Sequence, residues 1–170
     1  MKVKKILRNL LILVLLIVNI GCDQLSKSIV RQNIDYYEYI NVIDNFVILT
    51  KVENTGAFLG LGDSLPRMIY IILMIILPLV VLGYTLYYLL TKNNLPKMAI
   101  LGICLIIGGG LGNIYDRLIY GSVTDFLQIN FVLFKTGIVN IADVSVTTGL
   151  FIILYEVAIH RGNLNLKTSE

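Results

Sequence analysis

The stretch that decides the fold runs from Ile107 to Asp143 and reads IGGGLGNIYDRLIYGSVTDFLQINFVLFKTGIVNIAD. It begins in a glycine-rich apolar segment and ends where another apolar segment starts. Between these segments lie Asp116 and Asp125, and Asp143 closes the stretch. A carboxylate at membrane depth is costly unless it is paired, protonated or facing water, so these aspartates are candidates for a functional site.

Composition places the chain in a membrane. Of 170 residues, 56% are hydrophobic and 15% are charged, and the mean hydropathy of +0.81 is too high for an ordinary soluble domain. A net charge of +3, without a basic block interleaved with aromatics, gives no reason to expect nucleic acid as a partner. Cys22 and Cys104 lie in or beside apolar runs, and we expect both to be reduced. We expect one membrane-embedded domain over residues 1–170.

Four apolar runs are long enough to cross a bilayer. We place them at about residues 6–30, 68–90, 98–118 and 139–159. Pro78 predicts a kink in the second span, which membrane helices tolerate. Gly108 and Gly112, four residues apart in the third span, predict the close approach of a neighbouring helix. The sequence therefore predicts an α-helical integral membrane protein with four transmembrane helices.

The first span has a second interpretation. Residues 1–22 have a positive head, an apolar run and a final Gly-Cys, as a lipoprotein signal peptide has. In that case residues 1–21 would be lost and Cys22 would carry lipid. However, Asn19 stands where such sites favour an aliphatic residue, and Asp23 and Lys27 follow at helical spacing. We therefore expect a retained helix.

Residues 35–67 form the longest polar-containing interval between spans. Within it, Asn45 to Val52 is rich in β-branched and aromatic residues, which favours a strand, and the Asn-Thr-Gly triplet at 54–56 signals a turn. The run from Phe126 to Phe134 fits either a strand or an interfacial segment. We expect a small extracytoplasmic β-cradle with a loop that serves as a lid.

Lysine and arginine gather on one side of the four-helix layout. They precede the first span, join the second and third, and follow the fourth, within residues 2–8, 92–97 and 160–167. The positive-inside rule makes this side cytoplasmic, together with both termini. Residues 35–67 and 117–137 then face outward.

Amide, carboxylate and cationic side chains collect at the outer ends of the spans, where residues three and four apart share a helix face. They are Asp23 and Lys27 at the end of the first span, Asn113, Asp116 and Arg117 at the end of the third, and Asn140 and Asp143 at the start of the fourth.

Two carboxyl groups that share one proton can hydrolyse a peptide without a metal, because one activates water while the other protonates the carbonyl oxygen. Asp116 has Arg117 beside it in sequence, and Lys27, expected to pair with Asp23, could also be close. These cations would keep Asp116 ionised and structural. Asp125 and Asp143 have no adjacent cation, which favours them as the reactive pair without deciding the choice.

Other chemistries lack the residues they need. The single histidine, His160, is expected on the cytoplasmic side, so neither a zinc site nor a Ser-His-Asp set can be assembled with it. We expect no metal and no cofactor. A small transporter or proton pathway that uses intramembrane aspartates is the alternative function. It predicts acidic groups along the membrane depth, whereas these gather at one face.

Five blocks of the sequence, in order, resemble lipoprotein signal peptidase (signal peptidase II), a bacterial membrane aspartyl endopeptidase. The blocks are DQLSK at 23–27, NTGAF at 54–58, GGGLGNIYDR at 108–117, VTDF at 123–126 and NIAD at 140–143. Thr124 stands where this family usually has valine, and Val139 where it often has phenylalanine. Both positions flank the reactive groups and do not form them.

The resemblance implies that Asp125 and Asp143 are the catalytic pair. It also implies that substrate is bound by Asn54, Gly56, Asn113, Arg117 and Asn140, with structural support from Asp23, Lys27 and Asp116. The implied substrate is a prolipoprotein signal peptide followed by a diacylglyceryl-modified cysteine, cut just before that cysteine. The implied setting is the lipid of the bacterial inner membrane, with the active site at the outer leaflet. Globomycin-type peptides are the inhibitors that the resemblance implies.

Overall fold

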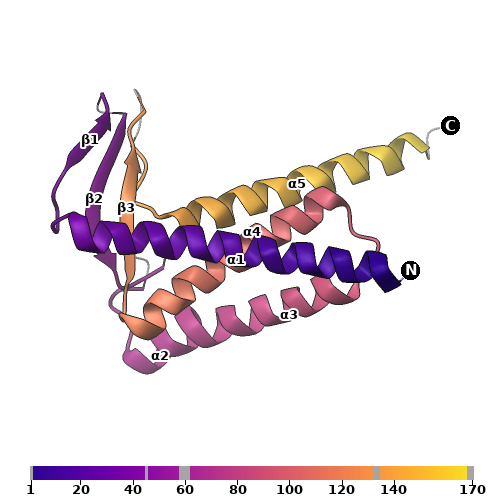
Figure 1. Cartoon of the computed structure of the whole chain (residues 1–170), viewed down its shortest axis with the longest axis horizontal. Helices are drawn as coiled ribbons and strands as arrows, with labels where there is room; N and C mark the ends of the chain where they lie inside the picture. The colour runs from indigo at the N-terminus through magenta and orange to yellow at the C-terminus, as the bar shows by residue number, and fades with distance from the viewer. Residues whose placement is uncertain (1, 45, 58–61, 132–134, 168–170) are drawn as a thin grey trace.

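The computed structural model describes residues 2–44, 46–57, 62–131 and 135–167, with side chains described from Val3 to Ile159 in these ranges. Within them, four helical stretches are long and apolar enough to cross a membrane, as the sequence predicted. They are Val3–Asn33, Arg67–Thr91, Lys97–Ile119 and Ile141–Ile159. A small sheet stands at one end of the helices (Figure 1).

The helices differ in regularity. α1 (Lys2–Asn33), α4 (Lys97–Ile119) and α5 (Ile141–Lys167) are single α-helices. The second span is built from α2 (Arg67–Ile71), the π-helical turn η2 (Ile72–Ile76) and α3 (Leu77–Thr91). Pro78 is the second residue of α3, two positions after η2 ends. A proline supplies no N–H to the preceding turn, so the wider turn lies where the sequence predicted a kink.

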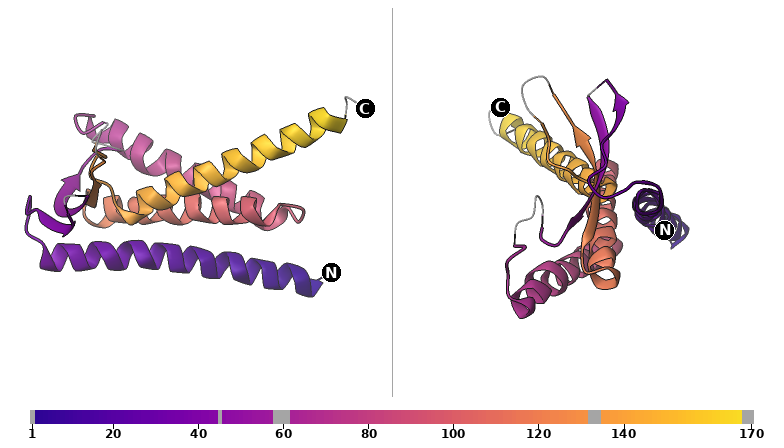
Figure 2. Two further views of the ribbon diagram at one scale, coloured as in Figure 1. Left: turned by 90° about the horizontal axis from the view of Figure 1, so that it is seen from above. Right: turned by 90° about the vertical axis from the view of Figure 1, so that its left-hand side faces the viewer.

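Helix α4 packs against α1, α3 and α5 (Figures 1 and 2). A Cβ added at Gly108 would lie 2.5 Å from Asn19 Nδ2, and one added at Gly112 would lie 2.5 Å from Asp23 Oδ2. Any larger residue at these positions would therefore push α1 away. The predicted close approach at this glycine pair is confirmed, and α1 is the helix that approaches.

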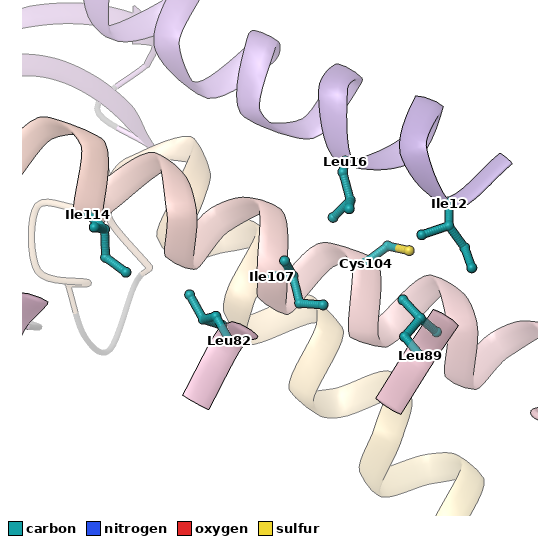
Figure 3. Packing of buried hydrophobic residues seen from close by; sticks show 7 residues of the cluster. All are labelled: Ile12, Leu16, Leu82, Leu89, Cys104, Ile107 and Ile114. Carbon is teal, nitrogen blue, oxygen red and sulfur yellow. The ribbon is translucent and has the colours of Figure 1, made fainter. Parts of the chain in front are cut away.

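An apolar cluster runs along the interior of the bundle, from Ile12 of α1 to Ile114 of α4 (Figure 3). Its buried members are Ile12, Leu16, Leu82, Leu89, Cys104, Ile107 and Ile114. The outward surfaces of the same helices are also apolar. In the second span, only 6% of the most hydrophobic 18-residue stretch is buried within the protein, so its apolar side chains face outward. A surface of this kind is suited to lipid, in agreement with the membrane assignment.

The sheet is antiparallel, with the order β1 (Ile40–Ile43), β2 (Val47–Asn54) and β3 (Val123–Ile129). The predicted strand at 45–52 is thus confirmed from residue 47 on, with Asn45 outside the described residues. The ambiguous run at 126–134 contributes the second half of β3, and its residues 132–134 lie outside the described part. The strand begins three residues earlier than that run.

A second apolar cluster joins the sheet to the helices. Val30 and Ile34, at the end of α1, are buried with Phe126 of β3. The sheet is thereby held beside the end of α1, at the end of the bundle where α5 begins (Figure 1). This placement brings residues of β2 and β3 to the ends of α1, α4 and α5.

Candidate active site

Asp125 lies in β3 and is 3% exposed. Its two carboxyl oxygens accept hydrogen bonds from two asparagines that come from different elements. Asn140 Nδ2 donates to Oδ1 at 2.6 Å, and Asn54 Nδ2 donates to Oδ2 at 2.9 Å. The carboxyl group is therefore buried, held from two sides, and fixed in orientation.

Asp143 lies in the first turn of α5, at the end of this helix that is next to the sheet (Figure 1). Asn113 Nδ2 donates to its Oδ1 at 2.9 Å, and the backbone N–H of Asn140 donates to its Oδ2 at 3.3 Å. In return the backbone N–H of Asp143 donates to Asn140 Oδ1 at 2.9 Å. This reciprocal arrangement is that of a helix capping box.

Asn140 thus contacts both aspartates. Its amide nitrogen bonds the carboxyl group of Asp125, while its amide oxygen bonds the backbone of Asp143. The structure therefore brings the predicted pair to one place, although the two residues come from a strand and from a helix.

The pKa of Asp125 is raised to about 6. Burial is the main cause, because it disfavours the charged form. The hydrogen bond from Asn54 opposes this shift, and the nearby negative charge of Asp143 adds to it. A carboxyl group of this kind can hold a proton closer to neutral pH than an exposed aspartate can.

A buried charge cluster lies beneath the pair. Lys27 Nζ lies 2.8 Å from Asp23 Oδ2, Asp116 Oδ2 and Asn113 Oδ1. The side chains of Lys27, Asp23 and Asp116 are completely buried. Asp23 also accepts the backbone N–H of Ala142 at 3.0 Å, which ties α1 to the start of α5. The predicted Asp23–Lys27 pair is present, and it is part of a larger network.

This network fixes the amide of Asn113. A lysine ammonium can only donate, so the amide oxygen must face Lys27, and the amide nitrogen is left to donate to Asp143. Asn54 is fixed in a similar way, because its Oδ1 accepts the backbone N–H of Gly56 at 3.0 Å. Its amide nitrogen is thereby left for Asp125.

Of the two cations expected near Asp116, Lys27 is confirmed and Arg117 was wrong. Arg117 donates instead to the carbonyl oxygens of Gly56 at 2.6 Å and Asn113 at 3.3 Å. The cation that joins Lys27 at Asp116 is Arg31, whose Nη2 lies 3.0 Å from Oδ1. Sequence reasoning missed Arg31, although it follows Lys27 by four residues and so shares its helix face.

Gln24 was missed as well. Its Nε2 lies 3.0 Å from Asp23 Oδ2, 3.1 Å from Asp116 Oδ1 and 3.2 Å from the carbonyl oxygen of Gly112. No spacing rule pointed to this residue, because two of its partners come from α4, 88 and 92 positions later in the chain. Among the described residues, no group of three or more His, Cys, Asp or Glu side chains could hold a metal ion.

Comparison with known proteins identifies the family. Residues 14–159 match the family described as signal peptidase (SPase) II. The chain belongs to this family. Lipoprotein signal peptidase of Clostridioides difficile (strain 630) is 40% identical over 147 residues, covering 86% of this chain and 94% of the relative. Lipoprotein signal peptidase of Streptococcus pneumoniae (strain ATCC BAA-255 / R6) is 35% identical over 147 residues, covering 86% of this chain and 92% of the relative.

Solved structures show the same fold. A structure entitled "Bacterial membrane enzyme structure by the in meso method at 2.3 A resolution" superposes with a TM-score of 0.79 at 26% identity, covering 89% of this chain and 90% of that one. The protein is therefore a multi-pass membrane protease of the aspartic type. The family match does not favour the alternative of a transporter or proton pathway.

Proposed function

We propose that this member of the family cleaves the signal peptides of prolipoproteins, with Asp125 and Asp143 as its catalytic pair. The observation that carries the proposal is that Asn140 joins a carboxyl group borne by β3 to one borne by α5. The family match supports the reaction class, and the hydrogen bonds of Asn140 support the choice of the two residues. The 170 residues act as one membrane-embedded peptidase domain.

The pair acts on a water molecule and a peptide carbonyl group. One carboxylate takes a proton from water as its oxygen attacks the carbonyl carbon, and the other carboxyl group gives its proton to the carbonyl oxygen. When the resulting diol collapses, the first group returns its proton to the departing nitrogen and the C–N bond breaks. The second group recovers the diol proton. Burial raises the pKa of Asp125, which helps this carboxyl group to carry the proton that it gives to the carbonyl oxygen.

Five residues around the pair bind the substrate backbone. They are Asn54, Gly56, Asn113, Arg117 and Asn140. Arg117 holds the carbonyl oxygen of Gly56, so the turn after β2 is attached to the helix that carries Asn113. Asp23, Lys27 and Asp116 support this arrangement from below through their buried ion pairs.

The segment after β2 forms a lid over the bound peptide. Thr55 Oγ1 donates to Asp63 Oδ1 at 2.8 Å, which joins the two ends of this segment. Phe58, the last residue of the expected lid motif, lies outside the described residues. Closure of the lid would exclude bulk water and so strengthen the polar contacts inside.

The substrate carries a diacylglyceryl group on the cysteine that follows the cut. Lipid attached at this point would fix the depth of the scissile bond near the membrane surface, where the pair lies at the ends of the spans. The sheet end faces outward from the bacterial inner membrane. Both termini and the basic residues at 2–8, 92–97 and 160–167 are cytoplasmic. Globomycin-type peptides compete for the same site.

The test uses purified protein in detergent and a synthetic prolipoprotein segment, with and without the diacylglyceryl group on its cysteine. We expect cleavage just before the cysteine of the lipidated peptide, read by mass spectrometry, and inhibition by globomycin. Failure to cleave the lipidated peptide would contradict the proposed function. Equal cleavage of both peptides would contradict only the proposed requirement for the lipid, and not the cleavage itself.

A further inference from the structure

The two proposed catalytic carboxyl groups belong to different parts of the fold. Asp125 is carried by the sheet, whereas Asp143 is carried by the helix bundle. Their separation therefore depends on how the sheet is held against the helices next to Asp125. A contact that fixes this junction would control the reaction without touching the substrate.

The side of the strands turned away from the pair carries such a contact. Successive side chains of a strand point to opposite faces, so Thr124 and Ser122 point away from the face that carries Asp125. Glu53 lies opposite Thr124 in the register of β2 and β3. Its carboxylate accepts hydrogen bonds from Ser122 Oγ at 2.6 Å and Thr124 Oγ1 at 2.9 Å. Glu53 directly precedes Asn54, which bonds Asp125.

Arg31 ties this cluster to the helices. Its Nε donates to Thr124 Oγ1 at 2.8 Å, and its Nη2 lies 3.0 Å from Asp116 Oδ1. The guanidinium lies over the ring of Tyr120, 3.9 Å from its centroid. The Thr124 hydroxyl accepts from Arg31 and donates its single hydrogen to Glu53, so the direction of both hydrogen bonds is determined.

We propose that Arg31 and Thr124 are positioning residues that hold the strand bearing Asp125 at its working distance from the helix bearing Asp143. This inference rests on the proposed function of the pair. Neither residue is hydrogen-bonded to the carboxyl group of Asp125 in the described structure, and both act through the backbone of β3.

The planar guanidinium suits this task. It holds Thr124 and Asp116 at the same time in a fixed geometry, which the single ammonium of a lysine does not reproduce. Asp116 is in turn held by Lys27. The position of β3 is therefore fixed relative to both α1 and α4. A displacement of about 1 Å in a reacting group can cost roughly a hundredfold in rate.

The test compares Thr124→Val with Thr124→Ser in the cleavage assay with the lipidated peptide. Valine keeps the branched shape and removes the hydroxyl, whereas serine keeps the hydroxyl. Thr50→Val is the matched control. Thr50 is also fully buried, on the neighbouring strand, and its hydroxyl has no hydrogen-bond partner among the described residues. For each variant kcat, KM and the melting temperature are measured.

We expect Thr124→Val to lower kcat about tenfold, within the range that a small misplacement causes, with KM changed less than about twofold. Thr124→Ser should recover most of kcat, and Thr50→Val should leave it unchanged. A merely structural role would lower the melting temperature without changing kcat of the folded enzyme. Arg31→Lys should lower kcat as well, because a single ammonium nitrogen does not reproduce the separate Nε and Nη2 contacts of the guanidinium.

Several results would overturn the inference while leaving the proposed function intact. One is an active wild type for which Thr124→Val has a kcat within about twofold of normal; another is a loss that Thr124→Ser does not repair. If Thr124→Val does not fold, Glu53→Gln decides the matter. Its amide offers one acceptor oxygen to two hydroxyl groups, so an unchanged kcat would reject the inference. An inactive wild type would reject the proposed function itself.

Discussion

The two ends of the helix bundle are built from opposite kinds of residue on the same helices. Away from the sheet, Ile12 of α1 and Cys104 of α4 are buried in an apolar cluster with Leu89 of α3. Near the sheet, Lys27 of α1 and Asp116 of α4 are equally buried but form an ion pair. Apolar contacts are non-directional and adapt to small changes, whereas a buried charge needs each of its partners. Residues at the apolar end should therefore affect stability alone, whereas residues at the charged end near the sheet should affect both stability and catalysis.

The largest expected effect is that of Lys27→Met. It leaves the two buried carboxylates of Asp23 and Asp116 without their shared cation, and loss of one member of a buried pair costs about 3–5 kcal/mol. We expect a large loss of folded protein and of melting temperature in detergent. Lys97→Met, at an exposed lysine, is the matched control. Equal stability of the two variants would show that the charged end is not more demanding than the apolar end.

The second prediction concerns Leu89→Ala, which tests whether the apolar end of the bundle affects stability without affecting catalysis. Leu89 is fully buried, and removal of its side chain should destabilise the fold by about 2–5 kcal/mol. The folded fraction should retain the wild-type kcat, because Leu89 is far from the pair in the fold. Leu79→Ala, at a position 47% exposed, should cost much less. A fall in kcat of folded Leu89→Ala would contradict the separation of the two ends.

A smaller effect concerns the pH dependence of the polar end. The amide of Asn54 stabilises the charged form of Asp125, so its removal in Asn54→Leu should raise the pKa of Asp125 further. The pair then keeps its shared proton to higher pH, and the alkaline limb of the kcat/KM profile moves upward. Asn41→Leu, at an exposed asparagine of β1, should leave the limb in place. A shift to lower pH would contradict the assigned role of Asn54.

The four spans could be predicted because their length and composition are local properties. The glycine pair at 108 and 112 was informative for the same reason, since a spacing of four residues marks one face of a helix. Asp23 and Lys27 were recognisable as a pair on the same basis. Each of these predictions needed only the sequence within one helix.

The pairing of Asp116 with Arg31 in place of Arg117 could not be predicted in this way. Adjacent residues on a helix point about 100° apart, so Arg117 turns toward Gly56 although it stands beside Asp116 in sequence. Arg31 reaches Asp116 from another helix. The start of β3 was missed for a related reason, because its first four residues are all buried and give no alternation to recognise.

The most direct measurement is the turnover of the lipidated peptide by Asp125→Asn and Asp143→Asn, beside Asp44→Asn at an exposed aspartate as control. Because one carboxyl group cannot serve as both acid and base in the same step, we predict that each of the first two variants loses more than about a hundredfold in kcat while remaining folded. The control should keep full activity. Turnover near the wild-type level in either Asp125→Asn or Asp143→Asn would contradict the claim that these two carboxyl groups carry out the cleavage.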